Sequence, residues 1–228
     1  MGHDIGHTPF GHAGEHALRE VCPLGFNHNE QSVRVVERLE NDGRGLNLTW
    51  EVRDAIRCHS SGCSAAKTLE GRVLRYADKI AYINHDIEDA IRAGVLTEED
   101  IPFDIKYVLG RTKSDRITAL VMNLVENSTD DITMSSEMQK TYEQLIQFMF
   151  EAVYRNPKAK GEEGKARDLV KYLYSYYTAH VEKMPDEYRS IAEQEGAERA
   201  ACDYISGMSD RYAVSLCEEL MIPKFWQL

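Results

Sequence analysis

The sequence predicts an all-α fold, and two observations lead to that prediction. Apolar residues recur at helical spacing along most of the 228 residues, as Val33, Val36 and Leu39 do in "NEQSVRVVERLEND". Alternating runs of β-branched residues, which are typical of half-buried strands, are nearly absent. We therefore expect a multi-helical protein.

The clearest predicted helix lies between Thr68, a suitable N-cap, and Gly94, a suitable stop. Its expected apolar positions are Leu69, Val73, Ala77, Ile80, Ala81, Ile87 and Ile91. A shorter helix is predicted to begin after Thr49, and the helix over residues 29–42 is expected to stop at Gly43. The same periodicity predicts helical segments near 115–127, 135–155, 165–183 and 186–220.

The stretch "RNPKAKGEEGKAR", residues 155–167, is the best candidate for a linker, because it has a proline, two glycines and no large apolar residue. We expect it to join two helices on the surface. The predicted domain organisation is a core over residues 1–155, followed by a helical extension over residues 156–228 that packs on it.

The composition excludes some classes of function. A net charge of −11 argues against a general nucleic-acid binder, although a small phosphorylated substrate remains compatible with it. No stretch reaches the roughly 20 apolar residues of a membrane helix, and no signal peptide is recognisable. The five cysteines are scattered and form no CxxC pair, which favours a reducing compartment. We therefore expect a cytoplasmic protein without membrane partners.

The opening stretch "MGHDIGHTPFGHAGEH" concentrates half of the eight histidines in sixteen residues, together with Asp4 and Glu15. Neutral imidazole and carboxylate groups form a ligand set that suits divalent Mn, Fe, Ni or Zn. The alternative is a histidine-rich, solvated terminus. The "AGEHAL" helix start and the Pro-Phe dipeptide favour an ordered segment and, modestly, a metal site.

The string "GHDIGHTPFGHAGE" resembles the central motif of the HD-domain deoxynucleoside triphosphate triphosphohydrolases, the dGTPase family. Further stretches resemble the same family in the same order: "GFNHNEQSVRVVERLE", "GLNLTWEVRDAI", "LRYADKIAYINHDIEDAIRAG", and "CDYISGMSDRYA" followed by "IPKFW". The resemblance implies an all-α HD-domain fold, with the metal-dependent phosphohydrolase core in residues 1–155.

The resemblance also implies a set of site residues. Family members hold a divalent ion (Mn, Mg, Fe, Ni or Zn) through a His, an adjacent His-Asp pair and a later Asp. The pair matches His3 and Asp4, and the later aspartate matches Asp78. The catalytic His matches His12, with Glu15 one helical turn further on. The remaining matches are to residues that contact the substrate, namely His7, His28, Lys79, Tyr82 and Asp86.

The implied reaction is hydrolysis of a deoxynucleoside triphosphate to a deoxynucleoside and inorganic triphosphate, carried out by a homo-oligomer. Family members carry the first metal-binding His upstream of the His-Asp pair, where this sequence has only two residues. We therefore expect a truncated enzyme with weak or no activity. The alternatives are a catalytically impaired nucleotide-binding or regulatory protein and another HD-type phosphohydrolase. The motif "DYISGMSDRYA" is expected either to reach the nucleotide through Asp210, Arg211 or Tyr212, or to pack helices.

Overall fold

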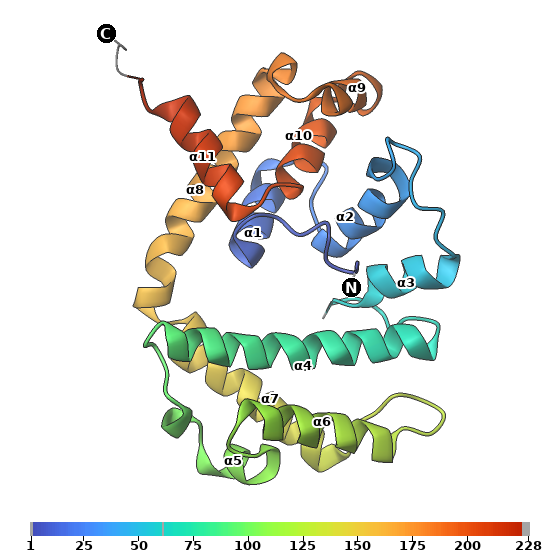
Figure 1. The fold of residues 1–228 in the computed structure, drawn as a ribbon, viewed down its shortest axis with the longest axis vertical. Coiled ribbons are helices and arrows are strands. Elements are labelled where there is room, and N and C mark those ends of the chain that lie inside the picture. Colours follow the sequence, from blue (N-terminus) through green and yellow to red (C-terminus); the bar gives the residue numbers. More distant parts are fainter. Residues whose placement is uncertain (1, 61, 225–228) are drawn as a thin grey trace. The chain divides into compact units, whose positions relative to one another are not determined.

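The computed structural model describes residues 2–60 and 62–224, and it confirms the all-α fold (Figure 1). No strand occurs among these residues. In the same part of the chain, no helix combines the length and the hydropathy that crossing a bilayer requires. Packing divides the chain into two compact units, Met1–Arg57 with Glu162–Leu228, and Cys58–Gly161. The boundary expected between residues 155 and 156 stays a prediction.

The first unit combines the two ends of the chain around one core. Its helices are α1 (Gly11–Val21), α2 (His28–Arg34), the π-helical turn η1 (Val35–Leu39), α3 (Trp50–Cys58, whose last residue falls in the second unit), most of α8 (Pro157–Ala179), the 3-10 turn η4 (Val181–Lys183), α9 (Asp186–Glu195), α10 (Ala197–Ser206) and α11 (Asp210–Met221). Buried residues of α1, including Ala17 and Leu18, pack against α8, α10 and α11. The N-terminal segment is thus packed against helices from the C-terminal part of the sequence.

The second unit is built on the longest helix of the described chain, α4 (Leu69–Arg92) (Figure 1). Its other elements are the 3-10 turn η2 (Glu98–Asp100), α5 (Phe103–Leu109), α6 (Lys113–Asn127), α7 (Ser136–Met149) and the π-helical turn η3 (Phe150–Tyr154). Ile80, Ile83 and Ile87 of α4 are buried in a core that α5, α6 and α7 complete. Thr68 caps α4 by accepting a hydrogen bond from the backbone of Gly71, as predicted.

The linker prediction was wrong. Residues 157–167, expected as a linker, belong to α8; Pro157 is the first residue of that helix, where its missing N–H is no disadvantage. Among the residues of α4, Leu69 and Val73 are exposed, whereas Ile83 and Asn84 are buried. The segment 186–220 is helical but is divided into α9, α10 and α11, with a break at Gly196.

Candidate functional site

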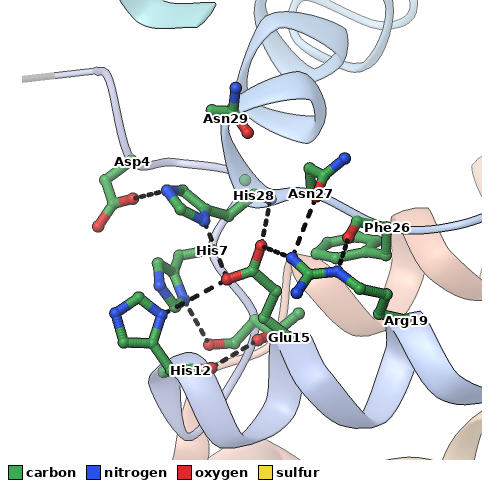
Figure 2. Close-up of polar contacts among 12 residues, drawn as sticks. Asp4, His7, His12, Glu15, Arg19, Phe26, Asn27, His28 and Asn29 are labelled. Carbon is green, nitrogen blue, oxygen red and sulfur yellow. Dashed lines mark hydrogen bonds and ion pairs between the residues drawn. The ribbon is translucent and has the colours of Figure 1, made fainter. Parts of the chain in front are cut away.

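The first unit brings several of the expected site residues into one cluster (Figure 2). Asp4 and His7 lie in the loop before α1, and His12 and Glu15 lie on the first turns of α1. His28 is the first residue of α2. The ring of His7 stacks on that of His28 with centroids 4.8 Å apart, and it lies 5.6 Å from the ring of His12.

Glu15 is the centre of this cluster. Its Oε1 accepts hydrogen bonds from Arg19 Nη2 at 2.8 Å and from the backbone N–H of His28 at 3.1 Å. Its Oε2 lies 3.1 Å from Nδ1 of His28 and 3.5 Å from Nδ1 of His12. Because an ionised carboxylate can only accept, Nδ1 carries the proton in both rings.

The charge state of Glu15 follows from these contacts. Burial by itself raises the pKa of this carboxyl group, but the hydrogen bonds from His12 and His28 outweigh it and hold the pKa well below its usual range. Glu15 is therefore an anion at neutral pH. It can stabilise a positive charge on His12, whose side chain is 62% exposed and thus open to a substrate.

His28 lies between two carboxylates. Its Nδ1 faces Glu15, and its Nε2 is 3.9 Å from Oδ1 of Asp4. The side chain of His28 is only 9% exposed. The arrangement is a chain of alternating carboxylates and imidazoles, Asp4, His28, Glu15 and His12, across α1, α2 and the loop (Figure 2).

Arg19 fixes the position of this chain. One turn after Glu15, its guanidinium donates to that carboxylate, to the carbonyl oxygen of Phe26 at 3.1 Å and to Oδ1 of Asn27 at 3.0 Å. The same side chain thus joins α1 to the residues that lead into α2. Sequence reasoning missed Arg19, although its i, i+4 spacing from Glu15 is a recognisable signal.

The loop that carries Asp4 and His7 is held by close approach to α2. Ser32, which is fully buried, accepts a hydrogen bond from the backbone N–H of Gly6 at 3.0 Å and donates one to the carbonyl oxygen of His28. A Cβ atom on Gly6 would lie 2.2 Å from the backbone nitrogen of Ser32. Only glycine therefore lets the loop reach α2.

Divalent metal ions fit the donor chemistry of this loop. His3 and Asp4 offer an imidazole and a carboxylate, the ligands that such ions prefer. A second group consists of His7, His12 and Glu15. Each of these residues has one donor atom that lies within 4.8 Å of those of the other two. Both oxygens of Glu15 already accept hydrogen bonds, however, so Glu15 and His12 are better described as members of the chain of carboxylates and imidazoles.

The other expected residues lie on α4 in the second unit. Asp78, Tyr82 and Asp86 follow one another at intervals of four residues, so they occupy one side of the helix. Burial lowers the pKa of the Lys79 ammonium group, and the neighbouring Arg75 lowers it further. These residues offer carboxylates, a phenol and an ammonium group within about two turns of one helix.

Tyr154 belongs to the same unit, and sequence reasoning missed it. Its hydroxyl donates a hydrogen bond to Oδ2 of Asp86 from the π-helical turn η3. Burial and the contact with Asp86 raise the pKa of Tyr154, so the phenol stays protonated and acts as the donor. π-Helical turns inside helical segments often occur at functional sites.

Comparison with known proteins identifies the family of the chain. A profile of the HD domain matches residues 2–83, and one of a phosphohydrolase-associated domain matches residues 132–219. A deoxyguanosinetriphosphate triphosphohydrolase-like protein of Caldanaerobacter subterraneus subsp. tengcongensis is 50% identical over 228 residues, which cover 99% of this chain and 67% of that protein. The chain belongs to the HD-domain, deoxyguanosinetriphosphate triphosphohydrolase-like family.

Further relatives in this family carry the same name. The protein of Clostridium tetani is 45% identical over 98% of this chain and 68% of its own length. That of Geobacter sulfurreducens is 33% identical over 98% of this chain and 72% of its own length. Membership makes the chain a metal-dependent phosphohydrolase of the HD type. The family motif "IPKFW" extends beyond the described residues.

Proposed function

We propose that the protein hydrolyses deoxynucleoside triphosphates, dGTP among them, to a deoxynucleoside and inorganic triphosphate. The observation that supports this most is the contact of His12 with Glu15, since it joins an exposed imidazole to a buried anion. An imidazole oriented by a carboxylate is suited to general acid–base catalysis.

In this reaction water attacks the α-phosphorus and releases a proton to the solvent, and the bond between that phosphorus and the 5′-oxygen breaks. His12 gives the departing 5′-oxygen its proton from Nε2, while Glu15 accepts the hydrogen bond from Nδ1–H and stabilises the cationic ring before the transfer. Because all three phosphates stay joined, the products are a deoxynucleoside and inorganic triphosphate.

The proposed metal ligands are His3, Asp4 and Asp78. A divalent ion bound there supplies Lewis-acid polarisation of the α-phosphate and a more acidic attacking water. Lys79 offsets charge on the phosphates.

The remaining residues that resemble family positions bind the substrate. His7 and His28 are proposed to lie around the phosphates. Asp86, oriented by Tyr154, is proposed to accept a hydrogen bond from the sugar, and Tyr82 to leave no room for a 2′-hydroxyl group.

Product analysis tests the proposal. The protein is incubated with dGTP and Mn²⁺, and the nucleosides and phosphates are separated by anion exchange. We expect deoxyguanosine and triphosphate in equal amounts, formed at the weak rate that the sequence predicts. His12→Ala should lower kcat by roughly 100-fold to 10,000-fold, the usual contribution of a general acid. His16→Ala is the matched control, because His16 is an exposed histidine of the same helix.

Release of pyrophosphate or orthophosphate would instead identify another HD-type phosphohydrolase. If none of the four deoxynucleoside triphosphates is hydrolysed with Mn²⁺, Mg²⁺, Fe²⁺, Ni²⁺ or Zn²⁺, the proposal is wrong. A rise in melting temperature with nucleotide under those conditions would identify a nucleotide-binding protein.

A further inference from the structure

Asp210 belongs to the motif "DYISGMSDRYA", to which the proposed reaction gives no part. Its Oδ1 accepts a hydrogen bond from the backbone N–H of Phe10 at 2.9 Å, across 200 residues of sequence. Phe10 directly precedes α1 and lies between His7 and His12. A carboxylate from the last described helix thus binds the histidine segment itself.

Phe10 has an unusual backbone conformation. Its φ of 64° and ψ of 25° place it in the left-handed region, which is unfavourable for a large L-residue. Such a conformation persists where neighbouring groups enforce it. The side chain of Phe10 packs against the core formed by α1, α8, α10 and α11, and Asp210 binds its amide. Phe10 is therefore held through both its side chain and its backbone amide.

The position of Asp210 is fixed by the cap of α11 and by the contact of that helix with α10. Asp210 is the first residue of α11, and the side chain of Ser209 caps that helix by accepting a hydrogen bond from the backbone of Tyr212. The hydroxyl of Tyr212 lies 2.8 Å from that of Tyr204 on α10, which joins the two helices.

The turn at Phe10 determines how His7 and His12 lie relative to each other. The hydroxyl of Thr8 donates to the carbonyl oxygen of Gly11 at 3.0 Å, so the turn is closed across Phe10. His7 comes before the turn and His12 after it, with their rings 5.6 Å apart. A change in the backbone of Phe10 would move one ring relative to the other.

We propose that Asp210 is a positioning residue that keeps Phe10 left-handed and so holds His7 beside His12. The inference rests on the proposed function where it concerns turnover. The competing explanation is that Asp210 only stabilises α11, as an acidic residue at a helix N-terminus does. Asp186 separates the two explanations, because it is the first residue of α9 and has the same place in its helix.

The experiment compares Asp210→Ala, Asp210→Asn and Asp186→Ala in the full chain. We expect Asp210→Ala to lower kcat on the order of 10-fold to 100-fold, because small misplacements of catalytic groups have effects of this size. KM should rise as well, because His7 is proposed to lie around the phosphates, whereas the melting temperature should change little. Asp210→Asn keeps an oxygen that can accept a hydrogen bond from the amide of Phe10, so this variant should retain most of the wild-type activity. Asp186→Ala should leave kcat unchanged.

A second readout is independent of turnover. The nuclear Overhauser effect between the rings of His7 and His12 should weaken in Asp210→Ala and persist in the other two variants. If the nuclear Overhauser effect between the two rings is unchanged in Asp210→Ala, the inference is overturned, whatever the activity of the variant. An unchanged kcat in Asp210→Ala, with an active wild-type protein, would overturn it too. If this nuclear Overhauser effect weakens in Asp210→Ala but the wild-type protein is inactive, the result supports the positioning role and refutes the proposed function.

Discussion

The ion pair between Arg34 and Asp203 gives a quantitative test of how the histidine cluster is supported. Asp203 on α10 is fully buried and accepts hydrogen bonds from Nε and Nη2 of Arg34 at 2.7 to 2.9 Å and from Nε2 of Gln31 at 2.8 Å. Arg34 and Gln31 belong to α2, which begins at His28. This pair therefore connects the helix of His28 to the C-terminal helices.

We predict that Asp203→Asn destabilises the first unit by about 3 kcal/mol. Removing one partner of a buried ion pair costs about 3–5 kcal/mol, because the other charge is left uncompensated. The lower value applies here, since Arg34 also contacts Glu195 through Nη1 at 2.9 Å. The asparagine has nearly the same shape, so no cavity adds to this cost.

Glu195→Gln is the matched control. Glu195 binds the same arginine, but its side chain is 41% exposed, so its loss should cost less than about 1 kcal/mol. Urea unfolding followed by far-ultraviolet circular dichroism measures both values. With an m-value of about 3 kcal/mol/M, Asp203→Asn should lower the midpoint by about 1 M. Equal shifts for the two variants, or a shift below about 0.3 M for Asp203→Asn, would refute the reasoning.

Three other predictions concern Glu15, a close contact in α1 and the metal. The pKa of Glu15 is below its ordinary value of 4.5, so the stability that its charge contributes is present above pH 4.5 and is lost as the pH falls below it. Glu15→Gln should abolish that part of the acid sensitivity in pH-dependent melting. Gly14→Ala should destabilise the protein in urea by about 2 kcal/mol, because its Cβ would lie 2.1 Å from a carbonyl oxygen of the preceding turn. The same change at Gly164, in α8 with open space around it, should stabilise by up to about 1 kcal/mol. EDTA should abolish turnover and Mn²⁺ restore it. Asp78→Asn should need at least roughly 10-fold more Mn²⁺, and Asp89→Asn, an exposed position of α4, should need no more.

The sequence was sufficient where structure depends on neighbours along the chain. Thr68 and Gly94 bound α4 as predicted, since capping involves residues within one turn. The contact of His12 with Glu15 was expected for the same reason. The linker prediction at 155–167 was wrong because proline and glycine were read as helix breakers. Pro157 instead begins α8, and the alanines, lysines and glutamates after it favour a helix.

The sequence was insufficient where contacts join remote segments. Nothing near Arg34 indicates that its partner is Asp203, 169 residues away, and nothing near Phe10 indicates Asp210. Tyr154 has no motif of its own, and only the fold of the second unit brings it to Asp86. Such pairs depend on how helices pack, which helical periodicity alone does not determine.

The same long-range pairs bear on how the two matched regions work together. Residues 2–83 match the HD domain and contain the histidine segment, but the amide of the left-handed Phe10 and the partly buried guanidinium of Arg34 bind carboxylates from outside that match. Asp210 accepts the hydrogen bond from Phe10, and Asp203 pairs with Arg34. Both aspartates lie within the phosphohydrolase-associated match at residues 132–219. A strained turn and a partly buried guanidinium are unfavourable without their partners. The histidine cluster therefore requires the C-terminal helices, and the associated region is part of the site's construction instead of an addition to it.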